Sequence, residues 1–213
     1  MNRKTIRKAL NCLILILVII GAVIMFRSKA SATGLTSSGW HNLKYYTVLS
    51  NIFAGIVAAM QMVCDARGRK PLVSLKITAT TATVLTFLVV AGFFGPLYGW
   101  IQFYQGANLF FHLIVPVLCI LEFMMMENSD KLTIRHCMLA ALSTVVYGSA
   151  YVINLIINGI GVWPDTNDWY GFVNWGYGMA AVIFIGIILV SFGIACLLRL
   201  IAIKSSGKKA SLK

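Results

Sequence analysis

Long apolar runs recur along the chain, and short polar connections separate them. The runs cover approximately residues 9–26, 43–64, 75–96, 108–126, 133–157 and 177–203. Each run is close to the length of about 20 apolar residues that an α-helix needs to cross a bilayer. The pattern predicts an all-α, polytopic integral membrane protein: a six-transmembrane-helix bundle that forms a single membrane domain over residues 1–213. Residues 204–213 form a basic tail, and no connection is long enough for a soluble domain.

Composition supports this class. The chain has 213 residues, of which 59% are hydrophobic and only 11% charged, whereas soluble domains are about 25% charged. The mean hydropathy is +0.85. The net charge of +12 does not indicate a nucleic-acid partner, because the basic residues flank the apolar runs and no nucleic-acid-binding motif is present. We interpret these basic residues as topology signals.

The distribution of Lys and Arg predicts the orientation. Of the 18 basic residues, 15 lie before the first run, in the second and fourth connections, or near the C-terminal tail. The other connections carry only three, namely Arg27, Lys29 and Lys44. The positive-inside rule therefore places both termini in the cytoplasm. Tryptophan prefers membrane interfaces, and all five tryptophans lie in or beside the predicted outer connections: Trp40, Trp100, Trp163, Trp169 and Trp175.

The first run has two interpretations. A basic start, an apolar core and the "ASA" at residues 30–32 resemble a cleavable signal peptide. The run is long, however, and Arg27 and Lys29 follow it directly, so we expect it to stay in the protein as a span. Cleavage would leave the predicted orientation of the other five spans unchanged.

Polar residues of three spans are expected to meet in the outer leaflet. Thr47 lies just inside the second span, with Asn51 one helical turn further on, and His112 lies at a similar depth in the fourth span. Polar groups inside a bilayer are costly and usually face the bundle interior. The fifth span adds a helical stripe, whose outer members Tyr151 and Asn154 can reach the same level; the whole stripe is Ser143, Tyr147, Tyr151, Asn154 and Asn158.

Each of these residues also has a structural interpretation. A threonine in a membrane helix commonly bonds to its own backbone, a lone histidine often joins two helices, and a Tyr/Asn stripe often packs between helices. The threonine-rich third span fits packing, and Glu122, near the inner end of the fourth span, fits a structural or topological role. The five cysteines form no CxxC pair, so we expect neither a disulfide nor a metal site.

Three segments carry a resemblance to a known family. They are "YYTVLSN" opening the second span, "FFHLIVPVLCILEF" in the fourth and "WYGFVNWGYG" before the sixth. Together they resemble the androgen-induced-gene / FAR-17a membrane family and its bacterial six-span relatives. The resemblance implies an intramembrane threonine hydrolase, because animal members cleave fatty acid esters of hydroxy fatty acids. By motif, Thr47 would be the nucleophile and His112 its base, and Asn51 also matches. A bacterial cytoplasmic membrane is then the expected location.

The implied chemistry is physically reasonable. A threonine hydroxyl is a poor nucleophile until a neighbouring base takes its proton, and a neutral imidazole is a suitable base. Asn51 and Tyr151 are candidate oxyanion donors, and Asn154 is a candidate for the substrate-binding wall. We therefore expect a membrane lipid ester as substrate, either hydrolysed or used for acyl transfer, and no cofactor.

A non-catalytic alternative remains open. The same polar cavity could bind a lipid or another small molecule without chemistry, or it could belong to a transporter. Transporters usually carry repeats, broken helices or paired membrane charges. Only Pro116 and Glu122 point that way in the sequence.

Overall fold

The computed structural model describes residues 2–29, 37–126, 131–162 and 166–210, with side chains described to residue 204. In these residues six helices are long and apolar enough to cross a membrane: Arg3–Arg27, Tyr46–Ala66, Val73–Tyr98, Ala107–Met124, Ile134–Asn158 and Tyr177–Lys204. The predicted all-helical architecture with six candidate spans is confirmed. The "ASA" segment at residues 30–32, Trp163 and Asp165 lie outside the described residues.

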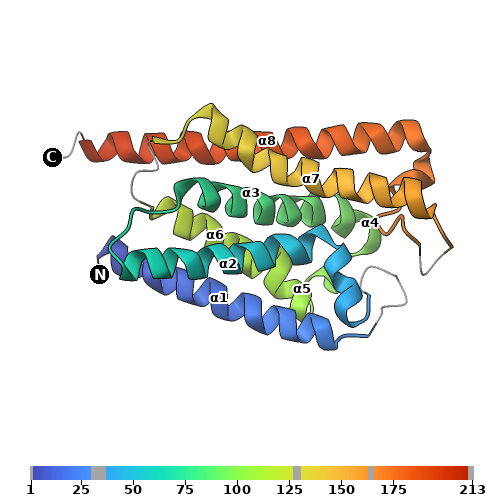
Figure 1. Cartoon of the computed structure of the whole chain (residues 1–213), viewed down its shortest axis with the longest axis horizontal. Helices are drawn as coiled ribbons and strands as arrows, with labels where there is room; N and C mark the ends of the chain where they lie inside the picture. The colour runs from blue at the N-terminus through green and yellow to red at the C-terminus, as the bar shows by residue number, and fades with distance from the viewer. Residues whose placement is uncertain (1, 30–36, 127–130, 163–165, 211–213) are drawn as a thin grey trace.

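Both termini lie at one end of the bundle (Figure 1). We call this the termini end, and the opposite end the cavity end. Which end faces the cytoplasm stays a prediction from the charge distribution. The first two spans are helices α1 (Arg3–Arg27) and α2 (Tyr46–Ala66), and the third begins with α3 (Val73–Val89). The fifth span is α7 (Ile134–Asn158), and the sixth lies in α8 (Tyr177–Ala210).

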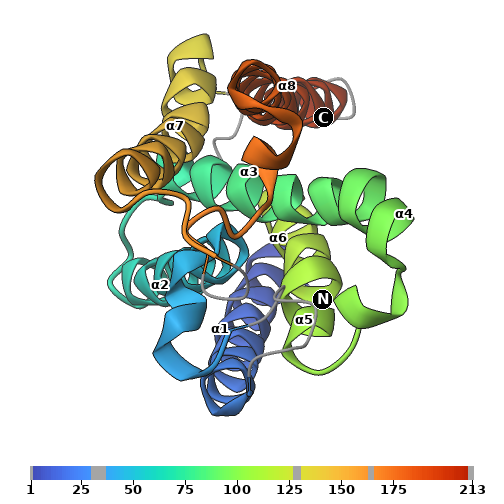
Figure 2. The same cartoon turned by 90° about the vertical axis from the view of Figure 1, so that its right-hand side faces the viewer.

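Helix α3 is the centre of the bundle. It packs against α2, α7, α8 and α6 (Val115–Met124), and Figure 2 shows α7 and α8 on one side of it and α1, α2 and α6 on the other. Two of its buried threonines bond to their own helix, which satisfies their hydroxyls. Thr83 Oγ1 donates to the Ala79 carbonyl at 3.1 Å, and Thr86 Oγ1 to the Thr83 carbonyl at 2.7 Å.

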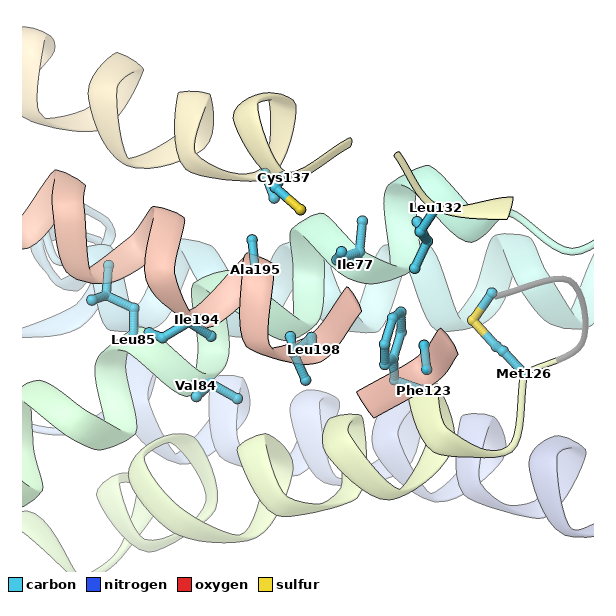
Figure 3. Packing of buried hydrophobic residues seen from close by; sticks show 12 residues of the cluster. Ile77, Val84, Leu85, Phe123, Met126, Leu132, Cys137, Ile194, Ala195 and Leu198 are labelled. Atoms are coloured by element: carbon cyan, nitrogen blue, oxygen red, sulfur yellow. The ribbon is translucent and has the colours of Figure 1, made fainter. Parts of the chain in front are cut away.

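An apolar cluster joins α3, α6, α7 and α8 toward the termini end (Figure 3). Ile77 of α3 and Cys137 of α7 are both 0% exposed within it. Phe123 of α6 and Leu198 of α8 complete the contact between the two sides of the bundle. Lipid hydrocarbon is as apolar as these side chains, so close packing rather than water exclusion holds such a cluster together.

Helix α1 approaches its neighbours closely at glycines. A Cβ added at Gly21 would lie 2.5 Å from Phe111 Cε1, and one at Gly55 would lie 2.8 Å from Val18 Cγ1. Only glycine leaves room for these contacts. Small residues at helix contacts are the usual way for membrane helices to pack. Helix α1 is therefore packed into the bundle as one of its spans.

Two of the spans contain a widened turn at the cavity end. In the third, a π-turn over Val90–Phe94 leads into α4 (Gly95–Tyr98). In the fourth, α5 (Ala107–Leu109) and a π-turn over Phe110–Ile114 lead into α6.

Each of these turns ends two residues before a proline, Pro96 and Pro116 respectively. Proline has no N–H to donate to the carbonyl four residues earlier, which for Pro116 is the carbonyl of His112. The backbone adjusts by widening the turn, and such turns often occur at functional sites.

Candidate functional site

A cavity of about 110 Å³ lies inside the cavity end of the bundle. Residues from α2, the third and fourth spans, α7 and α8 line it, together with the connection before α8. Among its described lining residues none is Asp, Glu, Lys or Arg. The polar lining consists of hydroxyl, amide, imidazole and indole groups, including Tyr46, Thr47, Asn108, His112, Tyr147, Tyr151, Trp169 and Tyr170.

Thr47 and His112 both line this cavity. Thr47 is the second residue of α2 and is half-buried. Its hydroxyl forms no hydrogen bond among the described residues, so it is not tied to its own helix. His112 lies in the π-turn of the fourth span and is 6% exposed. No hydrogen bond joins the two side chains in the described part of the chain.

A main-chain carbonyl fixes the tautomer of His112. The imidazole Nδ1 lies 3.0 Å from the carbonyl oxygen of Phe103, in the short 3₁₀ helix Ile101–Phe103. A carbonyl oxygen can only accept, so Nδ1 carries the hydrogen and donates it. The other ring nitrogen, Nε2, then holds a lone pair. His112 therefore has the protonation state that a general base requires.

Asn51 connects the backbones on which Thr47 and His112 lie. Its Nδ2 donates to the Thr47 carbonyl at 2.8 Å and to the Phe111 carbonyl at 3.0 Å. An amide nitrogen has two hydrogens, and both are used. Asn51 is also absent from the described cavity lining. The geometry therefore corrects the expectation of an oxyanion donor: Asn51 holds two helices together instead.

Tyr151 lines the cavity, but its hydroxyl donates to the carboxylate of Asp168. The same carboxylate accepts the main-chain N–H groups of Phe172, at 3.0 Å, and Val173, at 2.9 Å. Asp168 is only 4% exposed. The Tyr151 hydrogen is therefore not available to an oxyanion in this arrangement. The carboxylate instead fastens the connection before α8 to helix α7.

Asn154 does not lie at the cavity. It is absent from the described lining, and its Oδ1 accepts a hydrogen bond from Asn158 Nδ2 at 2.9 Å. The predicted stripe on α7 therefore divides: Tyr147 and Tyr151 reach the cavity, whereas Asn154 and Asn158 bond to each other beyond it. The expectation that Asn154 belongs to the substrate-binding wall is not supported by this geometry.

Tyr147 and Tyr170 form a hydrogen-bonded pair in the cavity lining, and this link was not foreseen from the sequence. Tyr170 Oη accepts the main-chain N–H of Tyr46 at 2.8 Å and lies 3.1 Å from Tyr147 Oη. Tyr147 donates its own hydrogen to the Lys44 carbonyl, so Tyr170 is the donor to Tyr147. Burial raises the pKa of Tyr170 well above its ordinary value, which keeps this hydrogen in place. The stripe on the fifth span had included Tyr147, whereas Tyr170 was noted only within the segment "WYGFVNWGYG".

A second polar cluster lies at the termini end. Arg7 of α1 pairs with Asp65 of α2 at 2.6 Å, and Lys76 of α3 pairs with Glu122 of α6 at 3.1 Å. All four side chains are at most 4% exposed. Charges inside a membrane bundle pair in this way because each would otherwise be desolvated alone. The pairs were not foreseen, since the charge count treated Arg7 and Lys76 as topology signals.

Two amides complete this cluster. Asn11 Nδ2 donates to Glu122 at 2.8 Å, and its Oδ1 accepts from Lys76. Gln61 Nε2 donates to Asp65 at 2.9 Å. Two spacings of four residues, Arg7 with Asn11 and Gln61 with Asp65, place each pair on one helical face. These spacings were a usable sequence signal.

No protein-family model, curated protein or solved structure matches the chain. The class of the protein is therefore defined by its own features. The described residues define an all-helical protein with six helices long and apolar enough to cross a membrane, which is the architecture expected of a polytopic integral membrane protein.

Proposed function

We propose that the protein is an intramembrane lipid ester hydrolase or acyltransferase, with Thr47 as nucleophile and His112 as general base. The observation that carries the proposal is that a Thr47 hydroxyl with no hydrogen bond among the described residues and a His112 ring held in the Nδ1–H tautomer both line one cavity. The two residues come from different spans. The resemblance to the androgen-induced-gene / FAR-17a family assigns the same two roles.

Two side chains carry the bond-forming and proton-transfer steps of this reaction. Thr47 Oγ1 attacks the ester carbonyl carbon, and its proton passes to His112 Nε2. The tetrahedral intermediate collapses as His112 returns the proton to the leaving alcohol, which leaves an acyl group on Thr47. Water then attacks the acyl carbon, with His112 again taking and returning a proton, and the fatty acid departs. An alcohol in place of water gives acyl transfer.

Phe103 has a positioning role in this scheme. Its carbonyl accepts the Nδ1 hydrogen, which orients the ring and stabilises the imidazolium that forms during attack. Asn51 sets the spacing between the two helices through the Thr47 and Phe111 carbonyls. Such preorganisation matters because the reacting atoms must come within about 3–3.5 Å of each other.

The proposed location is a bacterial cytoplasmic membrane, with the termini end in the cytoplasm and the cavity in the outer leaflet. The distribution of Lys and Arg supports this orientation. A cavity near the interface would let water reach the acyl-enzyme while the lipid stays in the bilayer.

Labelling with a fluorophosphonate probe tests the proposal. The purified protein in detergent is compared with Thr47→Ala, Thr47→Ser and His112→Ala. We expect labelling in the wild type and in Thr47→Ser, and none in the two alanine variants. Thr78→Ala is the matched control, because its hydroxyl only bonds the Ser74 carbonyl at 2.9 Å. Labelling that survives both Thr47→Ala and His112→Ala contradicts the proposal.

A second candidate function, a carrier for a small amphiphile, is supported by the paired charges Arg7–Asp65 and Lys76–Glu122. Paired intramembrane charges are typical of transporters. Uptake of fatty acid into vesicles that contain the protein would test this function. Uptake that depends on Glu122 and not on Thr47 would favour the carrier over the enzyme.

A further inference from the structure

A groove of about 860 Å³ lies between α7 and α8, toward the cavity end. Its walls are largely apolar, with Val152 and Ile156 on α7 and Ala180 and Ala181 on α8. Ile156 is 77% exposed. Both helices are membrane-spanning by length and composition, so the molecules available at this surface are lipid chains. Figure 2 shows α7 and α8 side by side on the same side of α3.

The groove and the catalytic cavity share one wall. Tyr151, Phe172 and Phe184 line both spaces, so these three aromatic rings separate them. Tyr151 and Phe172 are both bonded to Asp168, through a hydroxyl and a main-chain N–H respectively. The Phe184 ring of α8 makes no hydrogen bond among the described residues and can change rotamer without breaking one, whereas Tyr151 is held through its hydroxyl. The bond of Phe172 holds its main chain and leaves its ring free to turn.

Phe184 owes its position to a glycine. A Cβ added at Gly148 would lie 1.7 Å from Phe184 Cε2, so any side chain at Gly148 would displace the ring. Gly148 also lines the cavity. The ring therefore covers the backbone of α7 where the two spaces meet, with open volume on either side for a different rotamer.

We propose that this groove is a lateral entrance and binding site for one acyl chain of an uncharged ester lipid, and that Phe184 gates its passage to the cavity. The cavity alone, at about 110 Å³, is smaller than the roughly 300 Å³ at which ligand pockets begin. The ester would therefore lie beside Thr47 while the chain occupies the groove. The inference deepens the proposed function, and the catalytic meaning of the entrance rests on it.

Charge selects the class of lipid. Neither space has an Asp, Glu, Lys or Arg among its described lining residues. A phosphate group drawn inside would lose its hydration with no cation to replace it, which is strongly unfavourable. An uncharged ester, with one acyl chain passing between the aromatic rings of the shared wall, avoids this loss of phosphate hydration.

Photocrosslinking tests the site without relying on catalysis. The full-length protein in lipid nanodiscs is irradiated with a methyl palmitate analogue that carries a mid-chain diazirine, and adducts are located by mass spectrometry. We expect adducts on groove residues in the wild type. In Ala181→Trp, which fills the groove from an exposed position, they should fall by about tenfold, equivalent to about 1.4 kcal/mol of binding free energy, because the indole takes up the volume that the acyl chain would occupy.

Val182→Trp is the matched control, because Val182 is the next residue, is 63% exposed and does not line the groove. Its adducts should equal those of the wild type. An equal yield of groove adducts in Ala181→Trp and Val182→Trp overturns the proposal. Adducts concentrated on the lipid-facing side of α1 overturn it too, as does a crosslinked product of the size of a dimer. In Thr47→Ala the adducts should persist, so failure of the chemistry is distinguishable from failure of the groove.

Phe184→Ala tests the gate. Removing the ring should shift adducts from the groove to cavity residues such as Val89, which lines the cavity only. The wild type is the comparison, and its adducts should stay mainly on groove residues. If no adduct reaches a cavity residue in either protein, the groove is not an entrance.

Discussion

The side-chain amide of Asn51 donates a hydrogen bond to the main-chain carbonyl of Phe111, the residue directly before His112. The same amide holds the carbonyl of Thr47. A single buried side chain therefore sets the distance between the backbones that carry the proposed nucleophile and its base. The Oδ1 of Asn51 is buried without a partner among the described residues. The two hydrogen bonds that Nδ2 donates are therefore what holds the two backbones together.

Replacing Asn51 by Leu should slow fluorophosphonate labelling of Thr47. The variant keeps the approximate volume but removes both donors, which leaves the Phe111 carbonyl without this partner at a cost of about 1–3 kcal/mol. We expect at least about a tenfold lower labelling rate, equivalent to about 1.4 kcal/mol. Ser50→Ala is the control, because Ser50 also bonds the Thr47 carbonyl, at 3.0 Å, but its hydroxyl makes no hydrogen bond to another helix among the described residues. Equal rates in the two variants would show that the link to Phe111 is unimportant.

Replacing Asp168 by Ala should release the connection before α8. The N–H groups of Phe172 and Val173 lose their acceptor, and hydrogen bonds to a charged group are worth about 1.5–3 kcal/mol each. Hydrogen exchange at these two amides, followed by mass spectrometry, should accelerate. Tyr151→Phe removes only the third donor, so both amides should stay protected. Equal acceleration in the two variants would mean that Tyr151, and not the carboxylate, fixes the connection.

The ion pair between Lys76 and Glu122 should show strong coupling. Glu122→Leu or Lys76→Met alone leaves one buried charge unpaired, which costs about 3–5 kcal/mol. The double variant removes both charges and should lose clearly less than the sum of the two. Unfolding free energies measured in mixed detergent micelles form the double-mutant cycle. Additive losses would show that the 3.1 Å contact carries no interaction energy.

Helix α1 should remain in the mature protein. Its Asn11 bonds Glu122, and its Gly21 receives the ring of Phe111, so removing α1 would expose a buried carboxylate and open the wall beside the cavity. The intact mass of protein purified from membranes should include residues 1–29. A mass that corresponds to a chain beginning after residue 32 would contradict this prediction and would favour a cleaved signal peptide.

The fold was largely predictable because membrane spans follow from length and hydropathy alone. The number of candidate spans agrees with the structure. The widened turns were not foreseen, although Pro96 and Pro116 mark both of them, because an apolar run that contains a proline still reads as one span. Their position matters, since the second turn presents His112 to the cavity.

The candidate site was predictable only in part. Counting residues from the span ends placed Thr47 and His112 at one depth, and both line the cavity; their catalytic roles stay a prediction. The roles suggested for Asn51 and Tyr151 failed on hydrogen-bond partners, Phe111 and Asp168, that lie far away in the sequence. Helical spacing shows which residues share a face, but not what the neighbouring helix presents to them.

The location of a covalent adduct tests the central claim most directly. The wild-type protein is treated with a fluorophosphonate, digested, and sequenced by tandem mass spectrometry. The account predicts one dominant adduct, on Thr47 Oγ1, which is lost when His112 is changed to Ala. An adduct on another hydroxyl, such as that of Tyr46 or Tyr147, or no adduct in a protein that hydrolyses lipid esters, would contradict it.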